Sequence, residues 1–452
     1  MPSGAENAQG QGGWPPAASQ ETTSSPDGAL TVGFVGRRGA VFWLALTTGF
    51  WSILTLGFYR FWMKTRLRRY FWGSIRPGGH PMEYVGDPWE KLLGFFIAVV
   101  ILTFYIGVVN LLLMFASFTL FDGNVAGYFL SFLGVIPLWF YARYRARRYV
   151  LGRTRWRGVR FGLEPGAWGY AWRACLHWLV TICSLGILWP RMTFYLEKYR
   201  TDRTFFGSSR LTQGGTWTML YRAAVPLIVA LVLCGLWTLW VIVLQPLGPA
   251  LDLFARGVVA GATGIELDTS GVEGRQTMAL WRMWLLIPLM LSVYYGVVHY
   301  IFGARRAMAN HKTAPGVTFA SQLRTGRVAW IYAGGTVLAY LVLTLGIVLI
   351  GLVLLPVFGF DLLTDMVGAD RDLTFDVPRW FSIAASVILY FAVFLLWSVV
   401  YNTFVTFPLM RHMATTTVLQ EHAGLQRVSQ AARDEFAEAE GFAEALDLGA
   451  AI

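Results

Sequence analysis

The chain has 452 residues, of which 56% are hydrophobic and 14% charged, and its formal net charge is +11 at pH 7. Soluble domains carry about 25% charged residues, so this composition excludes an ordinary soluble domain and indicates a protein that lies in a lipid bilayer. In a soluble protein the positive charge would suggest nucleic acid. Here the cations flank apolar segments, which favours lipid headgroups and excludes nucleic acid as the expected partner.

The N-terminal segment, residues 1–30, is rich in Gly, Pro, Ser and Gln and has no apolar core. This composition is typical of a disordered tail, which we place in the cytoplasm. The segment lacks the basic region followed by an apolar region that marks a secretory signal, so we do not expect a cleaved signal peptide.

Eight apolar segments follow, and each is a candidate helix at membrane depth. If all eight crossed the bilayer, Arg-rich loops would lie on both sides, against the preference of Lys and Arg for the cytoplasmic side. If segments 40–59 and 172–190 enter and leave on one side, all Arg-rich loops become cytoplasmic. We therefore predict an all-α polytopic membrane protein with about six transmembrane helices and two partially inserted or re-entrant segments. The six predicted spans are residues 92–118, 127–142, 220–244, 279–302, 329–358 and 380–403.

The chain also repeats a pattern three times. Each copy has an aromatic residue, a tryptophan 9 to 11 positions later and then a Leu-Gly pair; the tryptophans and glycines are Trp43, Trp172, Trp330, Gly57, Gly186 and Gly346. Related tetrapeptides also recur as "GHPM" (79–82), "GVRF" (158–161) and "GVTF" (316–319). We predict an internal three-fold repeat within a membrane domain over residues 31–414, with units of roughly 31–145, 146–303 and 304–414. In the third copy the Leu-Gly pair lies in a long apolar run, so we expect that segment to span.

Three stretches carry a resemblance to a known family. They read "LTLGFYRFWMKTRLRRYFWG" (54–73), "RARRYVLGRTRWRGVRF" (145–161) and "SLGILWPRMTFYLEKYRTDRTFFG" (184–207). With them the chain resembles the YjgN-like family of bacterial inner-membrane proteins over roughly residues 30–415. The resemblance implies a multi-pass protein of the bacterial cytoplasmic (inner) membrane. It implies no activity, because the family is a domain of unknown function with no assigned catalytic residues.

The basic stretches form one group of candidate site residues. In the first stretch apolar and aromatic side chains share one helical face while cations occupy the rest, as in a helix that lies at the headgroup level. We therefore expect anionic lipid headgroups to bind at these cations, although the same residues could serve only to fix the topology. The candidates are Arg60, Lys64, Arg66, Arg68, Arg69, Arg147, Arg148 and Arg153.

Buried polar groups form a second group of candidates. The predicted spans contain Asn110 and Asn402 but no Asp or Glu near their centres, which disfavours a proton- or sodium-coupled carrier. Arg173 and His177 lie four residues apart on one face of the second inserted segment. They are candidates for a buried polar site, or simply face the membrane interface.

Enzyme motifs are absent from the sequence. It has no HExxH, GxSxG or P-loop pattern, and its six histidines lack the spacing of metal ligands. We therefore expect no enzyme, no cofactor and no metal site.

The C-terminal segment, residues 415–452, is acidic and carries Leu425, Val428, Ala432 and Phe436 at helical spacing. We predict a cytoplasmic amphipathic tail that docks on the basic loops or on a membrane or cytoplasmic protein partner, or else stays solvated. For the whole chain we expect a transporter or permeation-type protein for a lipidic or weakly charged substrate. The alternative is a non-enzymatic lipid-binding or scaffold protein for a membrane complex.

Overall fold

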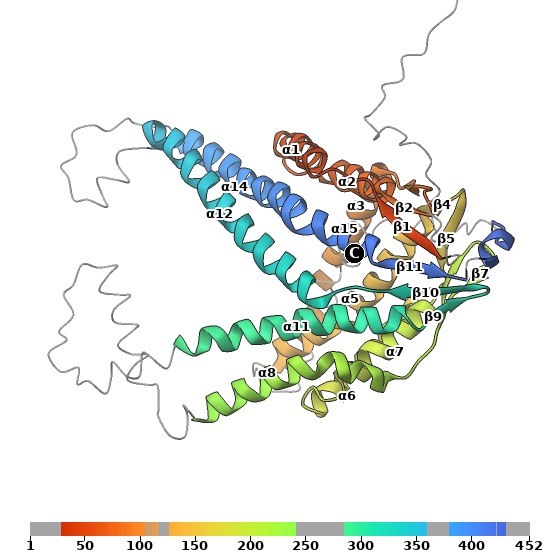
Figure 1. Cartoon of the computed structure of the whole chain (residues 1–452). Helices are drawn as coiled ribbons and strands as arrows, with labels where there is room; N and C mark the ends of the chain where they lie inside the picture. Colours follow the sequence, from red (N-terminus) through yellow and green to blue (C-terminus); the bar gives the residue numbers. More distant parts are fainter. Residues whose placement is uncertain are drawn as a thin grey trace, which may run out of the picture.

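The computed structural model describes residues 29–104, 107–108, 111–112, 114–115, 126–240, 284–358, 379–421 and 423–430. Within these residues the chain combines helices with two antiparallel sheets, so the prediction of an all-α protein is wrong. The long helices project to the left of the strands in Figure 1. The tail residues 1–28 and 431–452 lie outside the described part.

The strands are short and lie within or beside the basic loops. One sheet has the order β2-β1-β11-β10-β9-β8 and the other the order β3-β4-β5-β6-β7. Their bounds are β1 (Leu30–Phe34), β2 (Ile75–Pro77), β3 (Met82–Tyr84), β4 (Thr154–Trp156), β5 (Val159–Leu163), β6 (Thr204–Phe206), β7 (Ser209–Arg210), β8 (Thr212–Gln213), β9 (Lys312–Ala314), β10 (Val317–Ser321) and β11 (Thr417–Gln420).

The helices lie between the strands in the chain. They are α1 (Arg38–Leu54), α2 (Arg60–Ser74), α3 (Pro88–Phe104), α5 (Ala126–Gly152), α6 (Ala167–Cys183), α7 (Trp189–Thr201), α8 (Tyr221–Leu239), α11 (Leu286–Ala309), α12 (Thr325–Phe358), α14 (Arg379–Tyr401) and α15 (Phe407–Thr415). Short helical turns complete the described residues: η2 (Trp217–Leu220), the π-helical turn η4 (Asn402–Thr406) and η5 (Ala423–Arg427).

One arrangement recurs along the described chain: a strand, a departing helix, a returning helix and a strand that pairs with the first. The pairs β1–β2, β3–β4, β5–β6, β8–β9 and β10–β11 are all antiparallel and all flank such helices. We call the two sheets together the strand assembly. Each of these five helical hairpins leaves from one strand and returns to the strand that pairs with it, so all five start and end in the strand assembly. The predicted unit boundaries at residues 145 and 303 fall inside α5 and α11, and the three-fold repeat stays a prediction.

The two short hairpins, α1/α2 and α6/α7, turn at their tips in the same way. At the first tip the Gly57 amide donates to the Ser52 carbonyl at 2.7 Å, and at the second the Gly186 amide donates to the Thr181 carbonyl at 2.8 Å. Both glycines have positive φ, 93° and 85°, and in both tips the preceding leucine is left-handed as well. This six-to-one bond with a left-handed residue is the Schellman motif that ends helices. The first two Leu-Gly pairs of the sequence are therefore turns.

The third Leu-Gly pair forms no turn. Gly346 lies inside α12, which continues to Phe358. A Cβ at Gly346 would meet Leu396 Cδ1 of α14 at 2.9 Å, so here the glycine permits close helix packing.

Four helical segments among the described residues are long and apolar enough to cross a membrane: Trp217–Leu239, Leu286–Ala309, Thr325–Leu349 and Leu389–Thr415. They overlap four of the six predicted spans and indicate a membrane protein. Of the other two predicted spans, 92–118 falls partly outside the described residues and 127–142 lies within α5, and neither is among these four.

The buried core lies where helices meet strands. One cluster joins α5, β5, α6 and α7 around Tyr144, Tyr170 and Tyr199. Another joins α1 and α2 to α14 and α15 around Phe71 and Phe407. Farther along the helices, by contrast, large apolar side chains are exposed.

Candidate functional site

Residues of both sheets line an apolar cavity of about 320 Å³. Successive side chains of a strand point to opposite faces, so a strand that borders the cavity lines it with alternate residues. On β11, for example, Thr417 and Leu419 line it. Strands of both sheets contribute in this way, and so the cavity belongs to the strand assembly as a whole.

Aromatic rings form one wall of the cavity. Phe161 of β5 lies opposite Phe206 of β6 in the sheet register, and the ring centroids are 4.6 Å apart. The Trp156 ring of β4 lies 5.8 Å from Phe206. The turn between β4 and β5 places these rings: Arg157 and Gly158 both have positive φ, as a two-residue type I′ hairpin requires.

Helix α15 and the residues after β11 complete the lining. Met410, Met413 and Ala414 reach the cavity from α15, and Leu425 and Val428 reach it from the C-terminal side. Of the cavity-lining residues only Ser209 and Thr417 are polar. A cavity with so few polar groups offers nothing to bind ordered water, and the methionine side chains can adapt to the shape of an apolar guest.

The repeated tetrapeptides supply part of this lining. Their fourth residues, Met82, Phe161 and Phe319, all line the cavity. The glycines that open them, Gly79, Gly158 and Gly316, have positive φ and lie in or beside turns. The sequence thus contained a signal for the cavity: a turn glycine followed three positions later by a large apolar residue in an otherwise basic loop.

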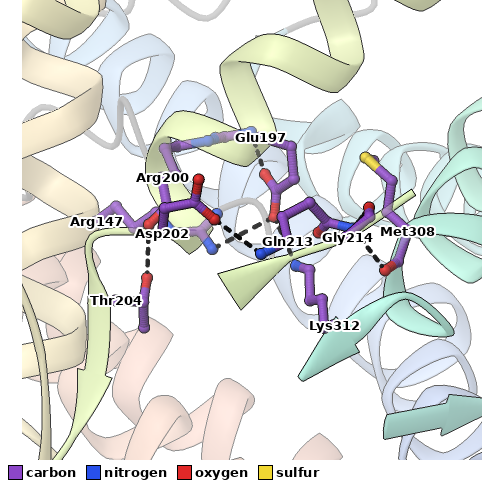
Figure 2. A network of polar contacts seen from close by, with 9 residues as sticks. All are labelled: Arg147, Glu197, Arg200, Asp202, Thr204, Gln213, Gly214, Met308 and Lys312. Atoms are coloured by element: carbon purple, nitrogen blue, oxygen red, sulfur yellow. Dashed lines mark hydrogen bonds and ion pairs between the residues drawn. The ribbon is translucent and has the colours of Figure 1, made fainter. Parts of the chain in front are cut away.

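A second feature is an ion-pair network centred on Glu197 of α7 (Figure 2). One Glu197 carboxylate oxygen lies 2.8 Å from Lys312 Nζ of β9 and 3.6 Å from Arg147 Nη2 of α5. The other lies 2.5 Å from Arg200 Nη2. The carboxylate therefore joins three hairpins at the level where helices become strands.

The Glu197 carboxyl is charged in the folded protein. Burial alone would raise its pKa, but the positive charges of Arg200, Lys312 and Arg147 hold that pKa well below its ordinary value. Beside the network, the backbone amide of Gln213 donates to Asp202 Oδ1 at 2.7 Å and its side-chain amide donates to the Met308 carbonyl at 3.0 Å. These contacts tie β8 to the ends of α7 and α11, a structural role.

A second polar cluster joins α3 to the end of α5. Arg153 Nη2 donates to both oxygens of Glu90 at 2.8 and 2.7 Å, and the Tyr149 hydroxyl donates to Glu90 Oε2 at 3.0 Å. Burial raises the pKa of Tyr149 well above its ordinary value, so the phenol keeps its proton for this bond.

The predicted headgroup residues divide into two groups. Arg60, Arg66 and Arg69 of α2 are exposed, although Arg69 also donates to the Gly86 carbonyl at 2.9 Å. The others are at least partly covered: Lys64 and Arg68 are half-buried, Arg148 is buried, and Arg147 and Arg153 are engaged in the ion pairs described above. Arg60, Arg66 and Arg69 are thus the part of the predicted set that lies at the surface.

The residues predicted to form a buried polar site are not brought together in one site. Arg173 is exposed and donates to the Gly169 carbonyl at 3.0 Å, while the His177 ring stacks on Tyr195 with centroids 5.5 Å apart. The Asn402 amide donates to the Ser398 carbonyl of its own helix at 2.7 Å. Asn110 lies outside the described residues. Among the residues that are described, no group of His, Cys, Asp and Glu could hold a metal ion.

The repeat tryptophans occupy equivalent places. Trp43, Trp172 and Trp330 each lie five residues after the first residue of α1, α6 and α12, and all three side chains are largely exposed. Tryptophans gather in this way where helices pass through the membrane–water interface.

Comparison with known proteins gives a family but no activity. No curated protein and no solved structure was found to match the chain. Residues 29–354 match the family described as bacterial protein of unknown function (DUF898), with which the YjgN-like resemblance is consistent. This match covers most of the described helices and strands, including four of the five strand-paired hairpins, and the chain therefore belongs to the DUF898 family of bacterial proteins.

Proposed function

We propose that this protein is a non-enzymatic, lipid-binding membrane protein whose strand assembly holds one hydrocarbon chain. The observation that carries the proposal is the cavity, because a hollow lined almost entirely by apolar side chains favours an apolar guest over water or ions. Lipid tails are the apolar molecules within reach of helices that lie in a bilayer.

The volume of the cavity limits the size of the ligand that it can hold. The volume of about 320 Å³ lies at the lower end of the range of about 300–1,000 Å³ that is usual for ligand pockets. That volume suits part or all of one chain and is small for a lipid with two. The ligand class is therefore an amphiphile that can place a single hydrocarbon chain in the cavity.

Transport remains the second candidate and has weaker support. A permeation path would need polar groups converging between the spans, whereas the Asn402 amide donates within its own helix and the His177 ring stacks on Tyr195. Most residues that line the cavity belong to the strands, and only the α15 end of one candidate span contributes to it, which favours binding.

We further propose the topology. The paired strands support placing every Arg-rich loop on the cytoplasmic side of the inner membrane together with both termini, because each hairpin returns to one strand assembly. The hairpins α3/α5, α8/α11 and α12/α14 make six spans. The short hairpins α1/α2 and α6/α7 dip into the cytoplasmic leaflet, supported by apolar tips at which Leu56 and Leu185 are 65% and 93% exposed.

Native mass spectrometry of the full chain tests the binding proposal. The protein is stripped of lipid in detergent, then given palmitate as a probe, and we expect one bound molecule per chain. Ala314→Phe fills the cavity and should lower palmitate occupancy about tenfold, equivalent to ~1.4 kcal/mol. The matched control is Val337→Phe, which adds a ring on an exposed helix surface and should leave occupancy unchanged.

Two results would overturn the binding proposal. One is wild-type protein that retains no palmitate; the other is equal occupancy in wild-type and Ala314→Phe proteins that are both folded. An ion or solute flux in liposomes that Ala314→Phe leaves intact would support the transport candidate instead.

Cysteine labelling in whole cells tests the topology after Cys175, Cys183 and Cys234 have been replaced. We expect His80→Cys, in the turn between β2 and β3, to react with an impermeant maleimide only after the cells are opened. Leu185→Cys should resist that reagent on both sides and react with a lipid-soluble one. Labelling of His80→Cys in intact cells contradicts the proposed orientation.

A further inference from the structure

The residues after β11 cross the strand assembly from one sheet to the other. We call residues 423–430 the strap. Glu421, with φ of 50°, turns the chain out of β11, and the strap then contacts both sheets without becoming a strand of either. Its Leu425 and Val428 side chains line the cavity.

The first anchor of the strap is the turn between β9 and β10, which belongs to the six-stranded sheet. The Gly424 amide donates to the Gly316 carbonyl at 3.1 Å. A Cβ on Gly424 would lie 2.1 Å from the Pro315 carbonyl oxygen, and one on Gly316 would lie 2.8 Å from Gly424 Cα. Two glycines therefore let the strap and the turn approach this closely.

The second anchor lies on the five-stranded sheet. The Ser208 amide donates to the Ser429 carbonyl at 2.9 Å, and the Ser429 amide donates to Ser208 Oγ at 3.2 Å. The Arg160 amide donates to Gln430 Oε1 at 2.9 Å. The strap thus bridges the sheets through a few hydrogen bonds and two apolar side chains.

Both anchors lie at the strand ends remote from the helices. β5 and β10 begin at these turns and run toward α6 and α12, while β6 comes from α7 and ends at the turn. Since the helices rise from the opposite strand ends, the strap covers the end of the cavity that faces away from the membrane domain.

We propose that the strap is a displaceable lid on the water-facing end of the cavity, through which the bound hydrocarbon chain exchanges with an acceptor on the aqueous side. The identity of the guest rests on the proposed function above, whereas the opening of the lid does not. The few exposed hydrogen bonds of the strap suit a segment that opens locally while the strands around it stay paired.

A buried reporter cysteine measures lid opening without any ligand. Ala414→Cys is placed in a chain whose native cysteines have been replaced, because Ala414 lines the cavity and is buried. Its reaction with an impermeant, sulfonated maleimide is followed in purified protein. A chain that ends at Glu421 should react about tenfold faster than one that ends at Gln430, equivalent to ~1.4 kcal/mol; both lack residues 431–452, so only the strap and its connection differ.

A point substitution keeps the test decisive if the shorter chain fails to fold. Gly424→Ala puts a methyl group against the Pro315 carbonyl and should also accelerate labelling about tenfold. Gly326→Ala is the matched control, because no atom lies within 4 Å of its added Cβ. Equal labelling rates in Gly424→Ala, Gly326→Ala and the parent protein would overturn the lid.

The two proposals fail in different measurements. If labelling accelerates but wild-type protein binds no palmitate, the lid stands and the hydrocarbon guest is wrong. If palmitate binds but labelling is unaffected by the strap, the guest stands and exchange through the strap is wrong.

Discussion

The helical hairpins and the strand assembly differ in where their apolar side chains lie. Along α8, α11 and α12 large apolar residues are exposed in series, whereas the strands turn theirs inward to a cavity and leave residues such as Gln420 outside. A bilayer solvates apolar surface and water does not. We infer from this contrast that the two regions are built for two solvents, and we take as their boundary the level where helices become strands, at which the Glu197 network lies.

The largest effect is expected at that boundary. Glu197→Gln removes the carboxylate shared by Lys312, Arg147 and Arg200, leaving partly buried cations without their partner. Breaking such a network costs about 3 kcal/mol of folding free energy, measured as the stability of purified protein in detergent. The control is Glu164→Gln at the more exposed pair with Arg210, where side chains are 34% and 60% exposed and the expected cost is at most about 1 kcal/mol.

A lysine scan tests the two-solvent interpretation directly. Leu231 of α8 is 53% exposed, yet Leu231→Lys should impair membrane insertion by about 3 kcal/mol, because a cation at a helix centre is costly in lipid. Gln420→Lys, at an exposed position of β11, should change stability by less than about 0.5 kcal/mol. Equal tolerance of the two lysines in an insertion assay would remove the distinction between the regions.

Substitution of a glycine at a hairpin tip should change stability less, and only through the backbone conformation. Gly186 has φ of 85° and open space around it, so Gly186→Ala should cost about 1–2 kcal/mol through the left-handed backbone alone. Gly235 of α8 also has open space but is helical, and Gly235→Ala should stabilise the protein by about 0.5–1 kcal/mol. The opposite signs, read from thermal unfolding in one detergent, would separate a turn glycine from a helix glycine.

The smallest effect concerns pH. The pKa of Glu197 is lowered in the folded protein, so its contribution to stability is fully present above its ordinary pKa of 4.5 and is lost as the pH falls from there toward the folded value. The stability difference between wild type and Glu197→Gln should therefore stay constant from neutral pH to about 4.5 and shrink below it. A difference that changes near pH 7 would mean that another group titrates with the network.

The sequence was sufficient for the long elements. Runs of apolar residues predicted α8, α11, α12 and α14 because bilayer helices need length and apolarity, which are local properties. The strands have two to five residues each and lie in basic loops, so no periodicity was long enough to reveal them. Their pairing is non-local: Leu30 lies opposite Leu419.

The roles of the basic residues were predicted less well, because their contacts are also non-local. Arg147 and Arg153 were assigned to lipid headgroups because cations beside apolar segments usually lie there. Their partners, Glu197 and Glu90, are 50 and 63 residues away in the chain, and Lys312 is 115 residues from Glu197. A single sequence does not show which distant carboxylate a cation will meet.

The pairing of β1 with β11 has a consequence for biosynthesis. Residues 30–31 of β1 can pair only after residues 418–419 of β11 have been synthesised. Insertion by a translocon proceeds along the chain, so the hairpins enter the bilayer while the first strand still lacks its last neighbour. Until β11 is made, the six-stranded sheet lacks the strand that lies between β1 and β10, so the cavity is completed only in the final stage of synthesis.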